Sequence, residues 1–292
     1  MATTTFPRSA AQPLVSVSQP YGPEGGVWLL SMHHMPDNRL TPASWHLTSD
    51  FIKHSLLPAL DFIELSYHRA CDKGHKKGAL VLTGERKKGK FFSNGLQLEL
   101  VGSCDGSFWT DYYYKLLARV LTFPMQTIAA INGHCFAGGL CLALACDWRI
   151  LRSDRAWLCM NEVLFGAPLP AGMASLLALR LPTRVLAKVM LTAHRYVATD
   201  ALRDGLVDEV VEVSNDKGED GSEATVRRAE EVARERAGFA ESGVLHLMKR
   251  TLYASTLAQL AIDEPPNLFE SVQGEREARV RQLVAAEVTA KL

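Results

Sequence analysis

The stretch Ile128–Asp147, IAAINGHCFAGGLCLALACD, decides the fold of this chain. Its first half is a strand-like apolar run that ends at Asn132-Gly133, and its second half is an apolar helical run that begins at Gly138-Gly139. No Ser, Thr, Asp or Asn side chain caps this helix, so the amides of the glycine pair stay free where the helix dipole favours negative charge. The stretch therefore predicts a strand, a loop that favours developing negative charge, and a helix.

Strand-like and helical runs alternate on both sides of this stretch. The strand candidates are VWLLSM (27–32), ALVLTG (79–84), QTIAAING (126–133), WRILRS (148–153) and DEVVEV (208–213). The helix candidates are 41–70, where Thr41-Pro42 offers a cap and a first-turn proline, then 108–123, 138–147 and most of the chain after Met173. This alternation, followed by a helical tail, predicts an α/β core that carries helices at its end.

Three regions follow from this pattern. We predict a flexible N-terminal arm over 1–21, a core over 22–212 and a C-terminal helical region over 213–292. The linker-like segment SNDKGEDGSEA separates the last predicted strand from the final helices.

Composition limits the classes of partner. The 292 residues are 47% hydrophobic and carry 32 acidic and 32 basic residues, so no net charge points to nucleic acid or to a membrane surface. No run approaches the ~18 apolar residues of a membrane span. The six cysteines form no CxxC pair and no metal-ligand cluster with histidine, which indicates reduced, buried thiols and no metal site. A small molecule or another subunit is the expected partner.

Two further loops contain candidates for chemistry. In Phe91–Gln97, FFSNGLQ, the glycine after Ser93-Asn94 permits a tight turn that aims the following amide outward. In Met160–Gly166, MNEVLFG, Glu162 is a single carboxylate within an apolar segment. Burial would raise the pKa of Glu162 and suit it to act as a general base. The alternatives from the residues alone are an ordinary glycine turn, and a Glu162 that pairs with an arginine or caps a turn.

Together, FFSNGLQL, IAAINGHCFAGGLCLALACDWRI, MNEVLFGAPLPAGM and ALRDGLVDEVVE resemble the enoyl-CoA hydratase/isomerase (crotonase) superfamily over roughly 27–260. The resemblance implies an α/β fold, a crotonase-type spiral of ββα units with a C-terminal helical trimerisation region. It implies an acyl-CoA thioester substrate, a homotrimer or hexamer, and no cofactor or metal. It assigns Glu162 as the catalytic base and the backbone N–H groups of Leu96 and Gly138 as an oxyanion hole. The residues implied to bind substrate are Phe92, Ser93, Asn94, Gly95, Gly139 and Asn161.

One departure from the hydratase pattern narrows the implied activity. Hydratases of this family carry a second glutamate in the first turn of the glycine-pair helix, where this chain has Cys141. A single carboxylate is enough to shift a proton, so the resemblance favours the Δ3,Δ2-enoyl-CoA isomerases of fatty-acid β-oxidation. A hydratase-like enzyme of a specialised acyl-CoA pathway and a non-catalytic acyl-CoA-binding member are the alternatives.

Other assignments concern the CoA portion and the location in the cell. The resemblance implies that the region 33–40 and the turn 90–92 line the CoA side, while Lys249 and Arg250 either approach a phosphate or lie on a solvated helix face. The terminal Ala290-Lys291-Leu292 differs from the peroxisomal signal Ser-Lys-Leu in one small residue. We therefore expect recognition by the peroxisomal import receptor and location in the peroxisome.

Overall fold

The computed structural model describes residues 3–8, 11–41, 51–87, 89–97, 101, 108–214, 218, 220–265 and 268–290. Its strands form two sheets. The seven-stranded sheet has the order β1 (Thr4–Phe6), β2 (Val15–Ser18), β3 (Val27–Met32), β4 (Ala79–Thr83), β6 (Gln126–Ile131), β8 (Trp148–Arg152) and β10 (Glu209–Val211). The three-stranded sheet has the order β5 (Phe91–Ser93), β7 (His134–Phe136) and β9 (Leu158–Cys159). From β3 to β10 the large sheet is parallel, and so is the small sheet.

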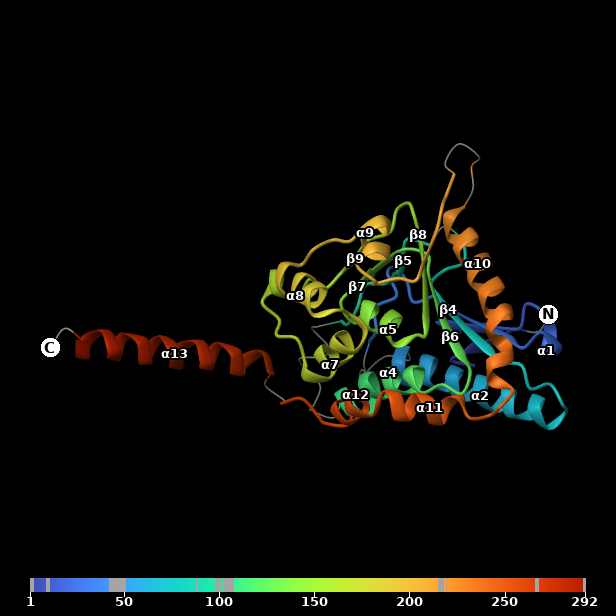
Figure 1. Ribbon diagram of the computed structural model, residues 1–292, viewed down its shortest axis with the longest axis horizontal. Helices are drawn as coiled ribbons and strands as arrows, with labels where there is room; N and C mark the ends of the chain where they lie inside the picture. Colours follow the sequence, from blue (N-terminus) through green and yellow to red (C-terminus); the bar gives the residue numbers. More distant parts are fainter. Residues whose placement is uncertain are drawn as a thin grey trace.

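Helices make up most of the remaining described chain (Figure 1). In chain order they are α1 (Gly22–Gly25), η1 (Phe51–Leu56), α2 (Leu57–Asp72), η2 (Trp109–Tyr113), α4 (Tyr114–Leu121), α5 (Gly138–Ala145), α6 (Glu162–Phe165), α7 (Ala171–Arg180), α8 (Thr183–Thr192), α9 (Ala198–Arg203), α10 (Gly221–Arg236), η4 (Ala237–Ala240), α11 (Leu245–Leu252), α12 (Ala254–Gln259) and α13 (Leu268–Ala290). The predicted strands and helices are thus confirmed in type, although the helix predicted from Thr41 is described only from Phe51 onward.

Both faces of the large sheet are covered. Val27 and Leu29 of β3 pack in one cluster with Val226 and Ala229 of α10, which runs along that face in Figure 1. The alternate residues of β3, such as Trp28, enter the main core with the side chains of α2, α4 and α5. A parallel sheet buried on both faces needs the near-continuous apolar strands seen in the sequence.

The N-terminal segment differs from the predicted flexible arm. β1 pairs with β2, and β2 pairs with β3, both antiparallel, so the segment extends the sheet at its edge. Phe6, Val15 and Val17 are buried in the main core. The alternation in VSVS is the signal of a half-buried strand, and it accounts for this difference.

Lys249 also differs from its prediction. It is 3% exposed on α11, where its ammonium group donates to the carbonyl oxygens of Phe123 (3.1 Å) and Met125 (2.7 Å) and pairs with Asp147 at 2.5 Å. The same Asp147 carboxylate accepts from the Thr127 amide. Lys249 therefore joins α11 to the core. Of the two basic residues Lys249 and Arg250, Arg250 alone is exposed.

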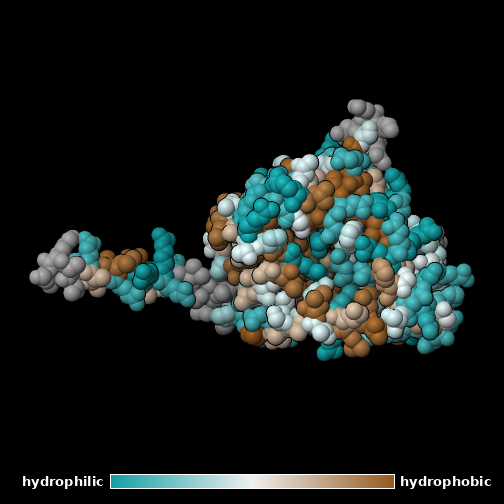
Figure 2. All heavy atoms as spheres, viewed as in Figure 1, coloured by the Kyte–Doolittle hydropathy of each residue, from teal (hydrophilic) through white to brown (hydrophobic). Residues whose placement is uncertain are grey.

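The last helix, α13, extends away from the body of the molecule (Figure 1). Val280, Leu283 and Val284 of α13 are about half exposed, and apolar atoms are visible along it in Figure 2. Among the described residues, every helix is too short or too polar to cross a bilayer.

Candidate active site

The small sheet brings the three predicted loops to one edge. Because β5, β7 and β9 are parallel, their carboxyl ends lie together. The chain leaves β5 into Asn94-Gly95-Leu96, leaves β7 into Ala137-Gly138, and leaves β9 into Met160-Asn161-Glu162. Loops that are 24 to 66 positions apart in the sequence, counted between Leu96, Gly138 and Glu162, therefore meet.

A cavity of about 280 Å³ lies between these loops. It is lined by Arg39, Asn94, Leu96, Trp109, Ala137, Gly138, Asn161, Glu162, Phe165, Ala167, Pro168, Pro170 and Met173. Five of the predicted site residues belong to this lining, namely Asn94, Leu96, Gly138, Asn161 and Glu162. Glu162 is the only carboxylate in the lining formed by the described residues.

The Leu96 amide faces the cavity because the backbone groups of Gly95 and Gln97, on either side of it, bond to Leu40 in the opposite direction. Leu40 donates to the Gly95 carbonyl (2.8 Å) and accepts from the Gln97 amide (3.4 Å), so the Leu96 N–H points away from Leu40. The turn needs Gly95, whose φ is +85° and where a Cβ atom would lie 3.1 Å from the Gly138 nitrogen. The two loops are therefore in direct contact, and within the described part of the chain neither the Leu96 nor the Gly138 amide donates a hydrogen bond.

The backbone at the start of α5 is strained. Ala137 has φ +49° and ψ −124°, a conformation that costs a non-glycine residue about 1–3 kcal/mol. This conformation turns the chain from β7 into α5 and presents the Gly138 N–H to the cavity. Gly139 packs against β5 so closely that a Cβ atom there would lie 2.6 Å from the Ser93 carbonyl oxygen. Strain at a cavity wall, held by tight packing behind it, is typical of functional loops.

Glu162 begins the short helix α6 on the opposite wall. Burial raises the pKa of this carboxyl to about 7, although a hydrogen bond from its own backbone amide opposes the shift. Its Oε2 atom is shielded from solvent and has no hydrogen-bond partner in the described structure, and the same holds for Oδ1 of Asn161. The side chain thus forms no ion pair within the described residues, which excludes that alternative there, and it is poised to take or give a proton near neutral pH.

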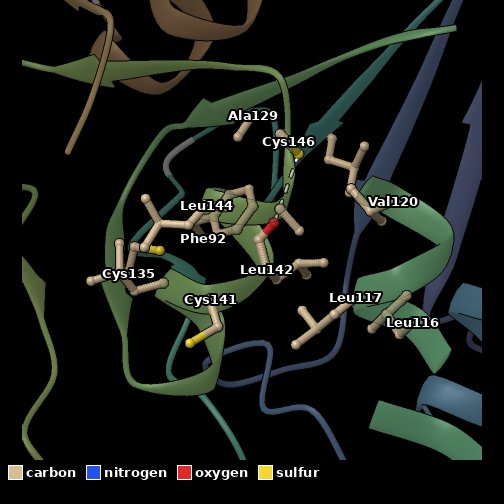
Figure 3. Close-up of a cluster of buried hydrophobic side chains, with 14 of the residues drawn as sticks. Phe92, Leu116, Leu117, Val120, Ala129, Cys135, Cys141, Leu142, Leu144 and Cys146 are labelled. Atoms are coloured by element: carbon tan, nitrogen blue, oxygen red, sulfur yellow. Dashed lines mark hydrogen bonds between the residues drawn. The ribbon is translucent and has the colours of Figure 1, made fainter. Parts of the chain in front are cut away.

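Cys141 lies on the first turn of α5, among the buried side chains shown in Figure 3. Burial raises the pKa of its thiol, and the charge of Glu162 raises it further. The thiol therefore stays protonated and neutral. The Tyr113 hydroxyl lies close to this thiol.

Four predicted substrate-binding residues lie behind the cavity wall. The Phe92 side chain is fully buried in the core (Figure 3). Ser93 donates to the Asn38 carbonyl (2.7 Å) and accepts from the Gly95 amide (3.2 Å), so its hydroxyl shapes the turn. Gly95 and Gly139 provide close packing between the loops. For Phe92 and Ser93 the reason is their place within β5, since only residues that follow the carboxyl end of this strand reach the cavity.

The two segments predicted for the CoA side lie differently relative to the cavity. Arg39 lines the cavity and pairs with Asp37 at 3.0 Å, and Asn94 donates to the same Asp37 at 2.7 Å. Lys90 and Phe91, however, stand at the amino end of β5, away from the cavity lining. Of the two segments, only Arg39 therefore lies in the cavity lining.

Sequence reasoning missed the wall that closes the cavity. Trp109, Phe165, Pro170 and Met173 supply its apolar side, and Tyr113 stands directly behind Gly138. The sequence contains only a faint signal for them, the aromatic run FWTDYYY, which reads equally well as a core helix.

Comparisons with known proteins agree on one family. Residues 66–279 match the family model described as enoyl-CoA hydratase/isomerase. The chain is 33% identical over 172 residues to enoyl-CoA delta isomerase 3 of Arabidopsis thaliana, covering 56% of this chain and 70% of that protein. It is 32% identical over 166 residues to the peroxisomal enoyl-CoA delta isomerase 2 of the same plant, covering 54% of this chain and 67% of that protein. The fold matches human mitochondrial delta3-delta2-enoyl-CoA isomerase with a TM-score of 0.65 at 20% identity, covering 95% of this chain and 99% of that one.

Proposed function

The chain belongs to the enoyl-CoA hydratase/isomerase family, and on that premise we propose that it is a Δ3,Δ2-enoyl-CoA isomerase. In this proposal it converts a 3-enoyl-CoA into the 2-trans-enoyl-CoA, in fatty-acid β-oxidation. The substrate is an acyl-CoA thioester, and the only cofactor-like group is the CoA of the substrate itself. The resemblance to two delta isomerases supports the reaction class, and the cavity supports the mechanism.

The mechanism uses one base and two backbone amides. The Glu162 carboxylate takes a proton from C2, and the electron pair of that C–H bond spreads over a dienolate whose negative charge rests on the thioester oxygen. The N–H groups of Leu96 and Gly138 donate to this oxygen, because charge that develops in a low-dielectric site is best stabilised by donors already in place. The protonated Glu162 then returns the proton to C4, which moves the double bond and restores the carboxylate.

The observation that carries this proposal is the lone carboxylate. Glu162 faces the cavity without a hydrogen-bond partner for Oε2 in the described structure, and burial raises its pKa to about 7. A base with this pKa is a stronger proton acceptor than an ordinary glutamate and still ionises at neutral pH. A single group that takes and returns one proton needs no second acid.

A hydratase-like reaction is the second candidate. The unpartnered Oδ1 of Asn161 lies beside Glu162 in the same cavity, and the two oxygens can hold a water molecule between them. Cys141 argues against this reaction, because a buried neutral thiol cannot replace the second carboxylate that water addition requires.

The test is a paired assay of wild type and Glu162→Gln. We expect the wild type to convert a 3-enoyl-CoA into a conjugated thioester of unchanged mass, and Glu162→Gln to lose about 10³-fold in kcat because the base is absent. Absorbance of the conjugated product and its mass would be followed together. Glu85→Gln serves as the control, since Glu85 pairs with His33 outside the cavity and should retain the wild-type rate.

Two outcomes would contradict the proposal. A product of 2-enoyl-CoA that is heavier by one water, formed faster than the 3-enoyl substrate is isomerised, would favour the hydratase candidate. Equal rates for wild type and Glu162→Gln would remove Glu162 from the mechanism.

We also propose that the protein acts in the peroxisome. The peroxisomal isomerase 2 of Arabidopsis supports this location, whereas the name of isomerase 3 specifies none. The proposed contact with the import receptor is Ala290-Lys291-Leu292, of which residues 291 and 292 lie outside the described residues. A fluorescent protein fused before residue 1 is expected to coincide with a peroxisomal marker, and removal of residues 290–292 is expected to disperse it. Unchanged distribution after the removal would contradict the role of these three residues.

A further inference from the structure

Tyr113 is a fully buried tyrosine whose hydroxyl group reaches the start of α5. Its ring stacks against Phe108, with centroids 6.4 Å apart, and meets Trp109 edge to face at 6.1 Å. Trp109 in turn lines the cavity. The ring is therefore fixed by the same aromatic group that closes the site, and its hydroxyl has little freedom to move.

The hydroxyl group holds the glycine whose amide faces the cavity. Tyr113 Oη donates to the Gly138 carbonyl oxygen at 2.8 Å. A Cβ atom on Gly138 would lie 3.0 Å from this hydroxyl, so the approach depends on glycine. Gly138 is thus fixed at both ends, by the strained Ala137 before it and by Tyr113 at its own carbonyl. The direction of its N–H group follows from these two constraints.

The Tyr113 hydroxyl also lies near Cys141, behind the cavity wall. Its single proton is directed to the Gly138 carbonyl oxygen. Burial raises the pKa of Tyr113 well above its usual range, so the phenol stays protonated and remains a donor. Tyr113 therefore cannot replace Glu162 as a base, and its effect acts through the backbone of Gly138.

We propose that Tyr113 is a positioning residue for the isomerase reaction, and that its hydrogen bond to the Gly138 carbonyl aims the Gly138 amide at the thioester oxygen. The proposal rests on the proposed function, because it concerns the amide that meets the enolate. The amide matters most when negative charge develops on that oxygen, so the hydroxyl contributes to the rate of the chemical step more than to substrate binding.

The test compares Tyr113→Phe with Tyr114→Phe. Phenylalanine at 113 keeps the ring contacts and removes only the hydrogen bond to Gly138. Tyr114 is an equally buried neighbour, whose hydroxyl donates to Glu264 and accepts from the Gly172 amide at 3.2 Å, away from Gly138. Four quantities would be measured on each purified protein: kcat and KM with a 3-enoyl-CoA, affinity for a saturated acyl-CoA, and the enolate absorbance of a bound 3-oxoacyl-CoA.

For Tyr113→Phe we expect kcat to fall about 10-fold with KM within about twofold, since a misaimed donor is less damaging than a deleted one. The enolate absorbance should weaken while saturated acyl-CoA binds as before. Tyr114→Phe should keep the enolate signal and kcat within about threefold of wild type.

Equal loss of enolate signal in both variants, or a kcat of Tyr113→Phe within twofold of wild type, would overturn the inference. A parallel loss of saturated acyl-CoA affinity would also overturn it, because it would indicate a collapsed pocket. If the wild type itself shows no isomerisation, the proposed function fails first, so the two failures are distinguishable.

Discussion

The Glu162 carboxylate is buried, and it is also the proposed base of the reaction. An unpaired carboxylate out of contact with water is unfavourable for the folded state, and proteins usually pair such groups. Here the described structure leaves Oε2 unpaired at a cavity that also borders two free amides. Burial disfavours the ionised carboxylate in the folded protein, and the same burial raises the pKa of Glu162. Stability and proton affinity are therefore linked at this position.

The pH dependence of the reaction follows from this pKa. Burial favours the protonated form and raises the pKa of Glu162 to about 7, and only the deprotonated form accepts the C2 proton. We therefore expect kcat/KM to rise with pH and to reach half of its plateau near pH 7, measured from pH 5 to pH 9 with a 3-enoyl-CoA. A profile already flat at pH 5 would mean that Glu162 has an ordinary pKa or is not the base.

The sequence could indicate that Leu96, Gly138 and Glu162 share one cavity, but not that Tyr113 stands behind it. The first three stand next to glycines or in an apolar loop, where an unusual residue is visible in the local pattern. Tyr113 acts on Gly138 across 25 positions, and one tyrosine in FWTDYYY is not distinguishable from the next without coordinates. Phe92 and Ser93 show the reverse error, because they lie within β5, whereas the cavity is lined by Asn94 and Leu96 beyond the end of this strand.

At the scale of elements, the short sheet β5-β7-β9 determines the site. Each of its strands has only two or three residues, yet each is followed by a loop that lines the cavity. The strands of the large sheet could be predicted because they are long and continuously apolar. The small sheet could not, since two or three residues give no measurable period.

The contact between α5 and β5 yields a prediction for Gly139→Ala. The added Cβ atom would lie 2.6 Å from the Ser93 carbonyl oxygen and 2.7 Å from the Ser93 Cβ, both in a buried strand. We expect a loss of roughly 2 kcal/mol in the free energy of unfolding, measured by urea titration, because a packed core accommodates an extra carbon poorly.

Gly274→Ala is the matched control for this substitution. Gly274 is exposed in the helix α13 with no atom near its Cβ position, so alanine there should not destabilise the protein. An unchanged urea midpoint for Gly139→Ala would show that α5 can move away from β5.

At the scale of the whole molecule, two of the C-terminal helices carry exposed apolar side chains. Leu247, Met248 and Leu252 lie exposed on α11, and Leu283 and Val284 do so on α13. Apolar faces of this kind usually mark contacts between subunits. Both helices belong to the C-terminal region 213–292, to which the resemblance assigns trimerisation.

We predict a homotrimer in solution, with a mass by light scattering of about three times the 32.1 kDa of one chain. Met248→Glu combined with Leu252→Glu should lower this mass by placing charge in the contact. Leu65→Glu, at an isolated exposed position of α2, should leave it unchanged. A monomeric wild type would contradict the prediction, and a mass twice that of the trimer would indicate the hexamer.

The cysteines around α5 have a consequence for exposure to oxidants. Cys135, Cys141, Cys146 and Cys159 are buried, and burial raises the pKa of each thiol, to about 12 for Cys146 and about 11 for Cys159. Peroxide and alkylating reagents attack the thiolate, which these residues scarcely form at neutral pH. Cys71, partly exposed on α2, is the first described thiol that such reagents would modify, and it lies outside the lining of the cavity. Oxidation of the described thiols should therefore leave the activity intact at hydrogen peroxide concentrations that inactivate enzymes with exposed active-site thiols.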